Sequence, residues 1–220
     1  MTRRTIRAFP VLAVALLVGC GTAGGSSSDL DKALDVELPG FMRAAVPQTP
    51  LTLCDADPSG TGLTPPSLPA ELGPSTAVFF QAAPATLEAY AWRASAEAIQ
   101  EADPESAPAS DAEAAQAVVD AATTAAVAAC PFEVTTQVHT DGDGVPDGIG
   151  TDGQSVAPWS RSGWQGVRIH RTVTGQEQTD RRLVRSGDVV LLVVLRADRD
   201  DPGTLGPVDD FLEAVARNLE

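Results

Sequence analysis

The sequence has few of the residues that usually carry catalytic chemistry. Among its 220 residues there are two histidines, His139 and His170, and a single lysine, Lys32. A lone lysine outside any glycine-rich motif excludes a P-loop and most Schiff-base chemistry. Neither histidine lies in an H-E-x-x-H pattern, and no G-x-S-x-G motif is present. The sequence therefore predicts no catalytic residues and a protein that is not an enzyme.

Positive charge is also scarce. Lys and Arg number 15 against 30 Asp and Glu, which gives a formal net charge of -15. A nucleic-acid-binding protein neutralises phosphates with an excess of cations, so this balance excludes nucleic acid as a partner. Hydrophobic residues make up 43% of the chain and charged residues 20%. This mixture can bury a core, as a folded domain requires.

The longest apolar run lies at the N-terminus. Three arginines (Arg3, Arg4 and Arg7) precede an apolar stretch at residues 9–18, which is too short to span a bilayer. The stretch ends in Leu17-Val18-Gly19-Cys20, which resembles the lipobox of bacterial lipoproteins. The alternative is an ordinary secretory signal with a chance cysteine.

The lipobox resemblance implies a cleaved signal peptide at residues 1–19 and acyl chains, palmitate among them, on Cys20. The glycine- and serine-rich residues that follow predict a flexible tether at residues 20–28. Two or more acyl chains give stable anchoring. We therefore expect an extracytoplasmic protein in the cell envelope, with the membrane as its partner through the lipid on Cys20. Heavy use of Ala, and of Arg over Lys, indicates a GC-rich, actinobacterial genome.

Two further cysteines remain for the folded part of the chain, Cys54 and Cys130. In an oxidising compartment such a pair predicts a disulfide, with Cα atoms about 4.4–6.8 Å apart. The alternative is a metal-binding pair, but neither cysteine has another cysteine or a histidine at ligand spacing.

Residue patterns predict one α+β domain over residues 29–220. Two segments stand apart: residues 47–74, rich in Pro and Gly, predict a surface excursion, and residues 139–163 a long polar loop. We expect an antiparallel sheet with a long Ala-rich helix and a C-terminal helix packed on one face, which leaves the other face partly open. The expected strands are 76–82, 86–92, 132–138, 164–173, 180–185 and 189–195. One or two short helical pieces are expected within residues 29–46, helices beginning near residues 95 and 110, and a C-terminal helix at 207–219. The strand 189–195 is apolar on both faces and should be central.

This order of features resembles the sensor-domain lipoproteins of actinobacteria, which are akin to the extracellular sensor domain of PknH-type receptor Ser/Thr kinases. The resemblance rests on the lipobox, on Tyr90-Ala91-Trp92 before the Ala-rich helix, and on Cys130-Pro131 at its end. Trp164 and the run Ser186-Gly187-Asp188-Val189-Val190 complete it. The resemblance implies ligand or stress sensing at the envelope. The kinase-linked domains look stapled by two disulfides, whereas this chain can form one.

An acidic, glycine-rich segment is a candidate calcium site. It contains Asp141, Asp143 and Asp147, and Asp152 follows. Alternating carboxylates let several oxygens converge on one hard cation, and the Gly-Val-Pro-Asp step resembles thrombospondin-type and dockerin loops. In that alignment His139 takes the first ligand position. The alternative is a solvated hairpin tip, because Asp-Gly pairs favour turns in any case. No other cofactor is expected.

A second candidate is a ligand groove lined by Tyr90, Trp92, Trp164 and Arg168. The alternative is that these rings fill the core or its edge. Five arginines on the expected adjacent strands could likewise form an anion site on one side of the sheet, or offset the surrounding acids: Arg168, Arg171, Arg181, Arg182 and Arg185.

The function predicted from these observations is a lipid-anchored, non-enzymatic binding or sensor-like domain whose ligand is a small molecule or a protein. One alternative is an envelope hydrolase with an unrecognised site, which a Ser or Asp cluster around His170 inside a cleft would favour. The other is a structural or partner-docking module, which a flat surface without a cleft would favour.

Overall fold

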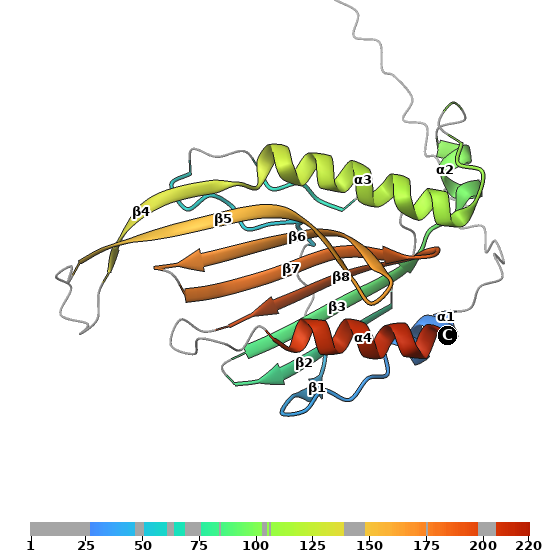
Figure 1. Ribbon diagram of the computed structural model, residues 1–220, viewed down its shortest axis with the longest axis horizontal. Coiled ribbons are helices and arrows are strands. Elements are labelled where there is room, and N and C mark those ends of the chain that lie inside the picture. The colour runs from blue at the N-terminus through green and yellow to red at the C-terminus, as the bar shows by residue number, and fades with distance from the viewer. Residues whose placement is uncertain are drawn as a thin grey trace, which may run out of the picture.

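All six strands that the sequence predicted are present in the structure (Figure 1). The computed structural model describes residues 27–46, 51–60, 64–68, 76–83, 85–102, 105, 107–138, 148–174, 176–197 and 206–220. This part of the chain contains one 8-stranded antiparallel sheet and four helices. The α+β class predicted from the sequence is confirmed.

The sheet has the strand order β1-β2-β3-β8-β7-β6-β5-β4. Its strands are β1 (Met42–Ala44), β2 (Thr76–Ala82), β3 (Ala85–Arg93), β4 (Phe132–Val138), β5 (Gly148–Arg161), β6 (Trp164–Val173), β7 (Gln176–Ser186) and β8 (Val189–Arg196). The meander from β4 to β8 brings β8 back beside β3. Every residue of β8 from Val189 to Leu195 is buried, which confirms its central place.

The Ala-rich helix α3 (Asp111–Ala129) covers one face of the sheet. Ser110 caps it, because its Oγ accepts a hydrogen bond from the Glu113 backbone N–H, as the spacing of a capping box predicts. The buried stripe of α3 is mostly alanine, which lets the helix lie close to β6, β7 and β8. Helix α2 (Ala96–Ala102) precedes it and contacts it.

The C-terminal helix α4 (Pro207–Leu219) covers the opposite face, in front of the sheet in Figure 1. Alternate residues of a strand point to opposite faces, and β3 separates the two cores accordingly. Leu87 and Ala89 pack with α4, whereas Tyr90 and Trp92 pack with α3. The prediction that both helices share one face is therefore wrong. Because β8 is apolar on both sides, each face needs a helix of its own.

Helix α1 (Ser27–Ala33) lies beside α4 and packs on β2. It begins at two serines that the sequence placed in the tether. Leu34 continues this core, and its backbone N–H donates to Leu30 O at 2.9 Å. None of the helices in the described ranges is both long and apolar enough to cross a membrane.

Two strands lie where the sequence predicted none. Strand β5 occupies much of the expected polar loop, and the short β1 lies within residues 29–46, where helical pieces were expected. Most side chains of β5 are exposed or half-buried, so its sequence lacks strong alternation. Pro158 is accommodated because β4 pairs with β5 only as far as Gln154, which leaves the other edge of β5 free at the proline.

Gly166 lets β6 and β7 lie close together. A Cβ atom at this position would lie 2.1 Å from Leu183 O and 2.8 Å from Val184 Cα. Both are backbone atoms that cannot turn aside. Trp159 is the partner of Gly166 on β5, so a large ring stands beside the missing side chain.

The surface excursion packs on the sheet and is not held by the disulfide at Cys54 alone. Its described part is residues 51–60 and 64–68. Leu53 is fully buried in the core under α3, and its backbone N–H donates to Pro66 O at 2.9 Å. Thr52 and Ser67 form an isolated β-bridge. An apolar anchor therefore supplements the disulfide.

Candidate functional site

The four residues predicted to line a groove do not come together. Tyr90 and Trp92 are buried under α3, with ring centroids 6.3 Å apart. Trp164 lies on the opposite face with 0% of its surface exposed, and its Nε1–H donates to Leu212 O at 2.9 Å. Arg168 lies on the face of Trp164 and binds Asp180. The rings fill the two cores, which was the alternative interpretation.

The five strand arginines are also divided between the faces. Arg171, Arg181 and Arg185 lie on the α3 face, whereas Arg168 and Arg182 lie on the α4 face. Four of them form ion pairs with carboxylates. Arg185 has no carboxylate within ion-pair distance among the residues that the structure describes. For these four arginines the structure favours the second interpretation, that they offset acids.

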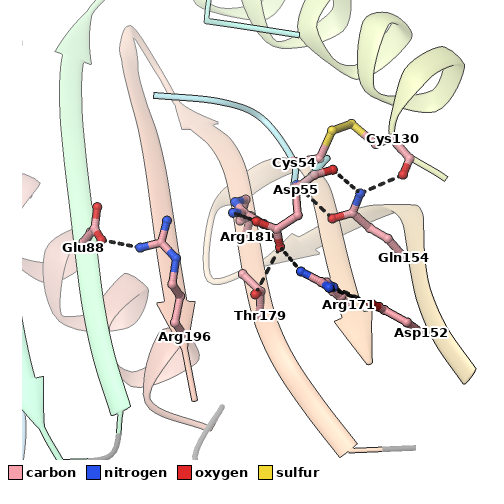
Figure 2. Close-up of polar contacts among 10 residues, drawn as sticks. All are labelled: Cys54, Asp55, Glu88, Cys130, Asp152, Gln154, Arg171, Thr179, Arg181 and Arg196. Carbon is pink, nitrogen blue, oxygen red and sulfur yellow. Dashed lines mark hydrogen bonds and ion pairs between the residues drawn. A yellow bond between two sulfur atoms is a disulfide. The ribbon is translucent and has the colours of Figure 1, made fainter. Parts of the chain in front are cut away.

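Asp55 is the centre of a polar cluster on the α3 face (Figure 2). Its carboxylate accepts two hydrogen bonds from Arg181, at 2.6 and 2.9 Å, and one from Thr179 Oγ1 at 3.3 Å. Arg171 Nη1 lies 3.5 Å from the same carboxylate and also binds Asp152. One acid from the excursion thus joins two strands of the sheet.

The disulfide predicted between Cys54 and Cys130 is present, with a Cα–Cα distance of 5.8 Å. Gln154 on β5 reinforces it. Its Nε2 donates to Cys130 O at 2.7 Å and to Asp55 O at 3.3 Å, and its Oε1 accepts from the Asp55 backbone N–H at 3.1 Å. The segment that carries Asp55 is therefore fixed by a covalent bond, by an amide and by its own carboxylate.

Electrostatics keep Asp55 ionised. Burial raises the pKa of its carboxyl, but hydrogen bonds from Arg181 and the charges of Arg181, Arg171 and Arg196 outweigh it, so the pKa lies below its usual value. Hydrogen bonding to Asp152 raises the pKa of Arg171 against the opposing effect of burial. The opposite charges of Asp55, Asp152 and the arginines around them therefore stabilise one another.

An ion pair on β3 and β8 lies at the left of Figure 2, beside the Asp55 cluster. Arg196 forms an ion pair with Glu88, which also accepts a hydrogen bond from the Tyr90 hydroxyl at 3.0 Å. The Arg196 side chain is 44% exposed. The pair therefore joins a buried carboxylate to a guanidinium at the surface.

The α4 face has its own cluster around Asp180, which is completely buried. Its oxygens accept from Arg168 Nε at 3.0 Å and from Arg182 Nη2 at 2.9 Å. Arg182 also binds Asp209 in the first turn of α4, and its guanidinium lies 4.6 Å from the Trp159 ring centroid. Burial lowers the pKa of Arg182, but its hydrogen bonds and ion pairs with Asp180 and Asp209 together outweigh burial, so the pKa lies above its usual value and the side chain stays charged. The cluster fastens the helix to the sheet.

His170 is the histidine that bears on the hydrolase alternative. It is half-buried on β6, and its cross-strand partner is Asp180. The Asp180 carboxylate accepts hydrogen bonds from two arginines. His170 is not among the residues that line a cleft between α3 and the strands β5 to β7. His170 therefore lies outside the cleft that a hydrolase site would need.

A cleft of about 450 Å³ lies between α3 and the strands β5 to β7; we call it the α3 cleft. Its lining residues are Gln116, Val119, Asp120 and Thr123 from α3, and Pro158, Trp159, Ser160, Gln165, Gly166 and Arg185 from the strands. The four helical residues recur at i, i+3, i+4 and i+7 and so share one side of the helix.

The charged groups of the α3 cleft have only neutral partners in the described part of the chain. Arg185 Nη2 donates to Gln165 Oε1 at 3.4 Å, and Asp120 accepts from Gln116 Nε2 at 2.7 Å. A second hollow, of about 520 Å³ beside β1, differs in this respect. Its arginine, Arg43, is already paired with Asp35 at 2.7 Å.

The candidate calcium ligands are mostly outside the described residues: Asp141, Asp143, Asp147 and also His139. Asp152 is described, and both of its oxygens accept hydrogen bonds from Arg171, at 2.9 and 2.6 Å. It is therefore part of the Asp55 cluster. Among the described ranges, no group of three metal-ligating side chains occurs. The lipidation residue Cys20 also lies outside them.

Sequence reasoning missed Asp55, Asp120 and Asp180. Asp55 had one usable signal, because a residue next to a disulfide cysteine is held in place. Asp120 had none beyond its position on the predicted helix. Asp180 was visible as an acid within an arginine-rich strand, but its complete burial depends on the register of β6 and β7.

No protein-family model, curated protein or solved structure matches this chain.

Proposed function

We propose that the protein is a lipid-anchored, extracytoplasmic binding domain of the sensor type, without catalytic chemistry of its own, and that it binds its ligand in the α3 cleft. One observation carries this proposal. Arg185 is half-buried in a cleft and lacks a carboxylate partner among the described residues, whereas Arg168, Arg171, Arg181 and Arg182 are all ion-paired. A guanidinium in that position is available for a ligand.

The walls of the cleft suit a binding role. One wall is a helix whose buried stripe packs closely on the sheet, and the other is a set of hydrogen-bonded strands. Side chains on regular elements hold their positions better than side chains on loops, which lowers the entropy lost when a ligand binds. The volume is also within the range of about 300–1,000 Å³ that small-molecule sites occupy.

The disulfide supports the expected location. Disulfides persist in exported proteins and are rare where thiols are kept reduced. Cys54 and Cys130 are both buried, and their bond closes a loop with a sequence separation of 76. A structural disulfide of this kind agrees with the lipobox at Cys20 in pointing to the cell envelope.

Native mass spectrometry of the purified full chain tests the binding role. We expect the wild-type protein to retain a small molecule that Arg185→Gln loses. Arg217→Gln is the matched control, because Arg217 is exposed on α4, which covers the opposite face of the sheet from α3, and it donates to the backbone oxygen of Glu213. A retained molecule that is insensitive to Arg185→Gln places binding elsewhere. If no ligand is retained, and none from a metabolite library shifts the resonances of the cleft residues, the binding function is refuted.

Membrane fractionation tests the anchor. We expect Cys20→Ala to abolish acylation and to release the protein from the membrane fraction. Wild-type fractionation of the variant would refute the lipoprotein assignment.

A further inference from the structure

We infer that the α3 cleft binds a small zwitterion, an amino acid or short peptide, whose carboxylate pairs with Arg185 and whose ammonium group pairs with Asp120. The inference rests on the proposed function and names the ligand class for the same site. It starts from the two opposite charges that line the cleft.

Arg185 supplies the anion-binding half. Its guanidinium presents a rigid fork of N–H donors that matches a carboxylate in a bidentate way. Its hydrogen bond to Gln165 Oε1, at 3.4 Å, is long for a bond of this type. A ligand carboxylate would replace a weak neutral acceptor with a charged one. Exchange of this kind favours the bound state.

Asp120 supplies the cation-binding half. It lies on the α3 wall, and Gln116, one turn earlier on the helix, donates to it at 2.7 Å. This bond orients the carboxylate without neutralising it. In the described part of the chain no arginine or lysine lies within ion-pair distance of Asp120. A ligand ammonium group would provide the missing counter-charge.

The presence of both charges selects between ligand classes. A simple anion would gain from Arg185 but would be repelled by Asp120 and by a chain with a net charge of -15. A simple cation would meet the reverse conflict at Arg185. A ligand with one charge of each sign, spaced to match, gains from both groups at once.

The remaining lining residues fit a peptide. Gln116, Gln165, Thr123 and Ser160 provide donors and acceptors for an amide group, and Val119 offers an apolar contact for a small side chain. The cleft of about 450 Å³ is large enough for a small-molecule ligand.

The test titrates the purified full chain, with its disulfide intact, with three probes and follows side-chain NMR signals of Arg185, Gln116 and Gln165. The probes are alanyl-alanine, its N-acetyl derivative and its C-terminal amide. We expect alanyl-alanine to shift these signals, and each blocked derivative to bind about tenfold more weakly, as loss of one charge-assisted contact in a half-exposed cleft predicts.

Two variants assign the contacts. Arg185→Gln should remove the advantage of the free carboxylate over the amide, and Asp120→Asn the advantage of the free amine over the acetyl derivative. Each should leave the other preference intact. Arg217→Gln and Glu213→Gln, exposed residues of α4 with the same charge changes, should leave all three affinities unchanged.

The outcomes separate this inference from the proposed function. If the amide or the acetyl derivative binds as tightly as alanyl-alanine, or if none of the probes shifts the cleft signals, the zwitterion inference is overturned. The binding function still stands in that case if the native protein retains a different molecule that Arg185→Gln loses. If the control variants weaken binding as much as the cleft variants do, the effect is one of general charge, and the assignment to Arg185 and Asp120 is overturned.

Discussion

Removal of the Cys54–Cys130 disulfide should cost this protein a large part of its stability. The bond closes a loop with a sequence separation of 76. In the chain-entropy model a cross-link over a loop of that length restricts the unfolded chain by about 4.5 kcal/mol at 25 °C. Native domains are stable by about 5–15 kcal/mol in total, so the Cys54→Ala/Cys130→Ala variant should be close to its unfolding threshold.

The assay is urea unfolding followed by tryptophan fluorescence. We expect the free energy of unfolding to fall by about 4–5 kcal/mol in the double variant. The slope with urea concentration should rise, because a denatured chain without the cross-link exposes more surface. The reduced wild-type protein is the control, and its curve should match that of the variant. If the two curves match, the loss of stability comes from the missing disulfide and not from the alanine side chains.

Hydrogen exchange should show where the stability is lost. Residues 51–60 and 64–68 should lose protection first, because without the bond they are held by the buried Leu53 and by the polar contacts of Asp55, among them those with Gln154 and Arg181. The hairpin between β7 and β8 around Gly187 should stay protected, because it lies in the central part of the sheet. A fall below about 1 kcal/mol, or uniform loss of protection across both regions, would refute the reasoning that the bond limits the unfolded chain and fastens this segment.

Three further predictions concern the polar clusters and the sheet. Asp55 has a lowered pKa, so its contribution to stability is present above the ordinary value of 3.8 and is lost as pH falls through the lower folded value. Asp55→Asn should thus flatten stability against pH between about 5 and 2, and an unchanged slope in acid unfolding would contradict this. Gly166→Ala should lower the free energy of unfolding by about 3 kcal/mol or more, because the added Cβ would lie 2.1 Å from Leu183 O. Thermal unfolding measures the effect, and Gly187→Ala is the comparison, because no atom lies within 4 Å of a Cβ there and the loss of stability should be smaller. Asp180→Asn should cost about 3 kcal/mol in urea unfolding, because it leaves Arg182 buried with Asp209 as its remaining acid, and a cost under 1 kcal/mol would show that the pair adds nothing.

The candidate site shows where inference from a sequence stops. The arginines of β6 and β7 were recognised, and so was the alternative that they offset acids. Their division between two faces was not, because it depends on the register in which the strands pair. Arg181 and Arg182 are adjacent in sequence, yet one binds Asp55 under α3 and the other binds Asp180 and Asp209 beside α4.

The sequence by itself determined the local elements of this fold. Alternating residues specified β3 and β6, and the stripe of alanines with its Ser110 cap specified α3. Two cysteines outside the predicted signal peptide and lipid site specified their pairing. These features depend on neighbouring residues, whose periodicity and capping are visible in the chain. Strand β5 escaped prediction because most of its side chains stay in or near solvent and need no apolar alternation.

The tertiary structure decided which face each helix covers and which charges meet. Asp55 and Arg181 are separated by 126 residues, and Gln154 reaches Asp55 across 99. A contact of this kind is specified by the register of the sheet and by the docking of the excursion, neither of which leaves a local pattern. The α3 cleft has the same origin, because Asp120 and Arg185 line one hollow only after the helix has packed against the returning strands.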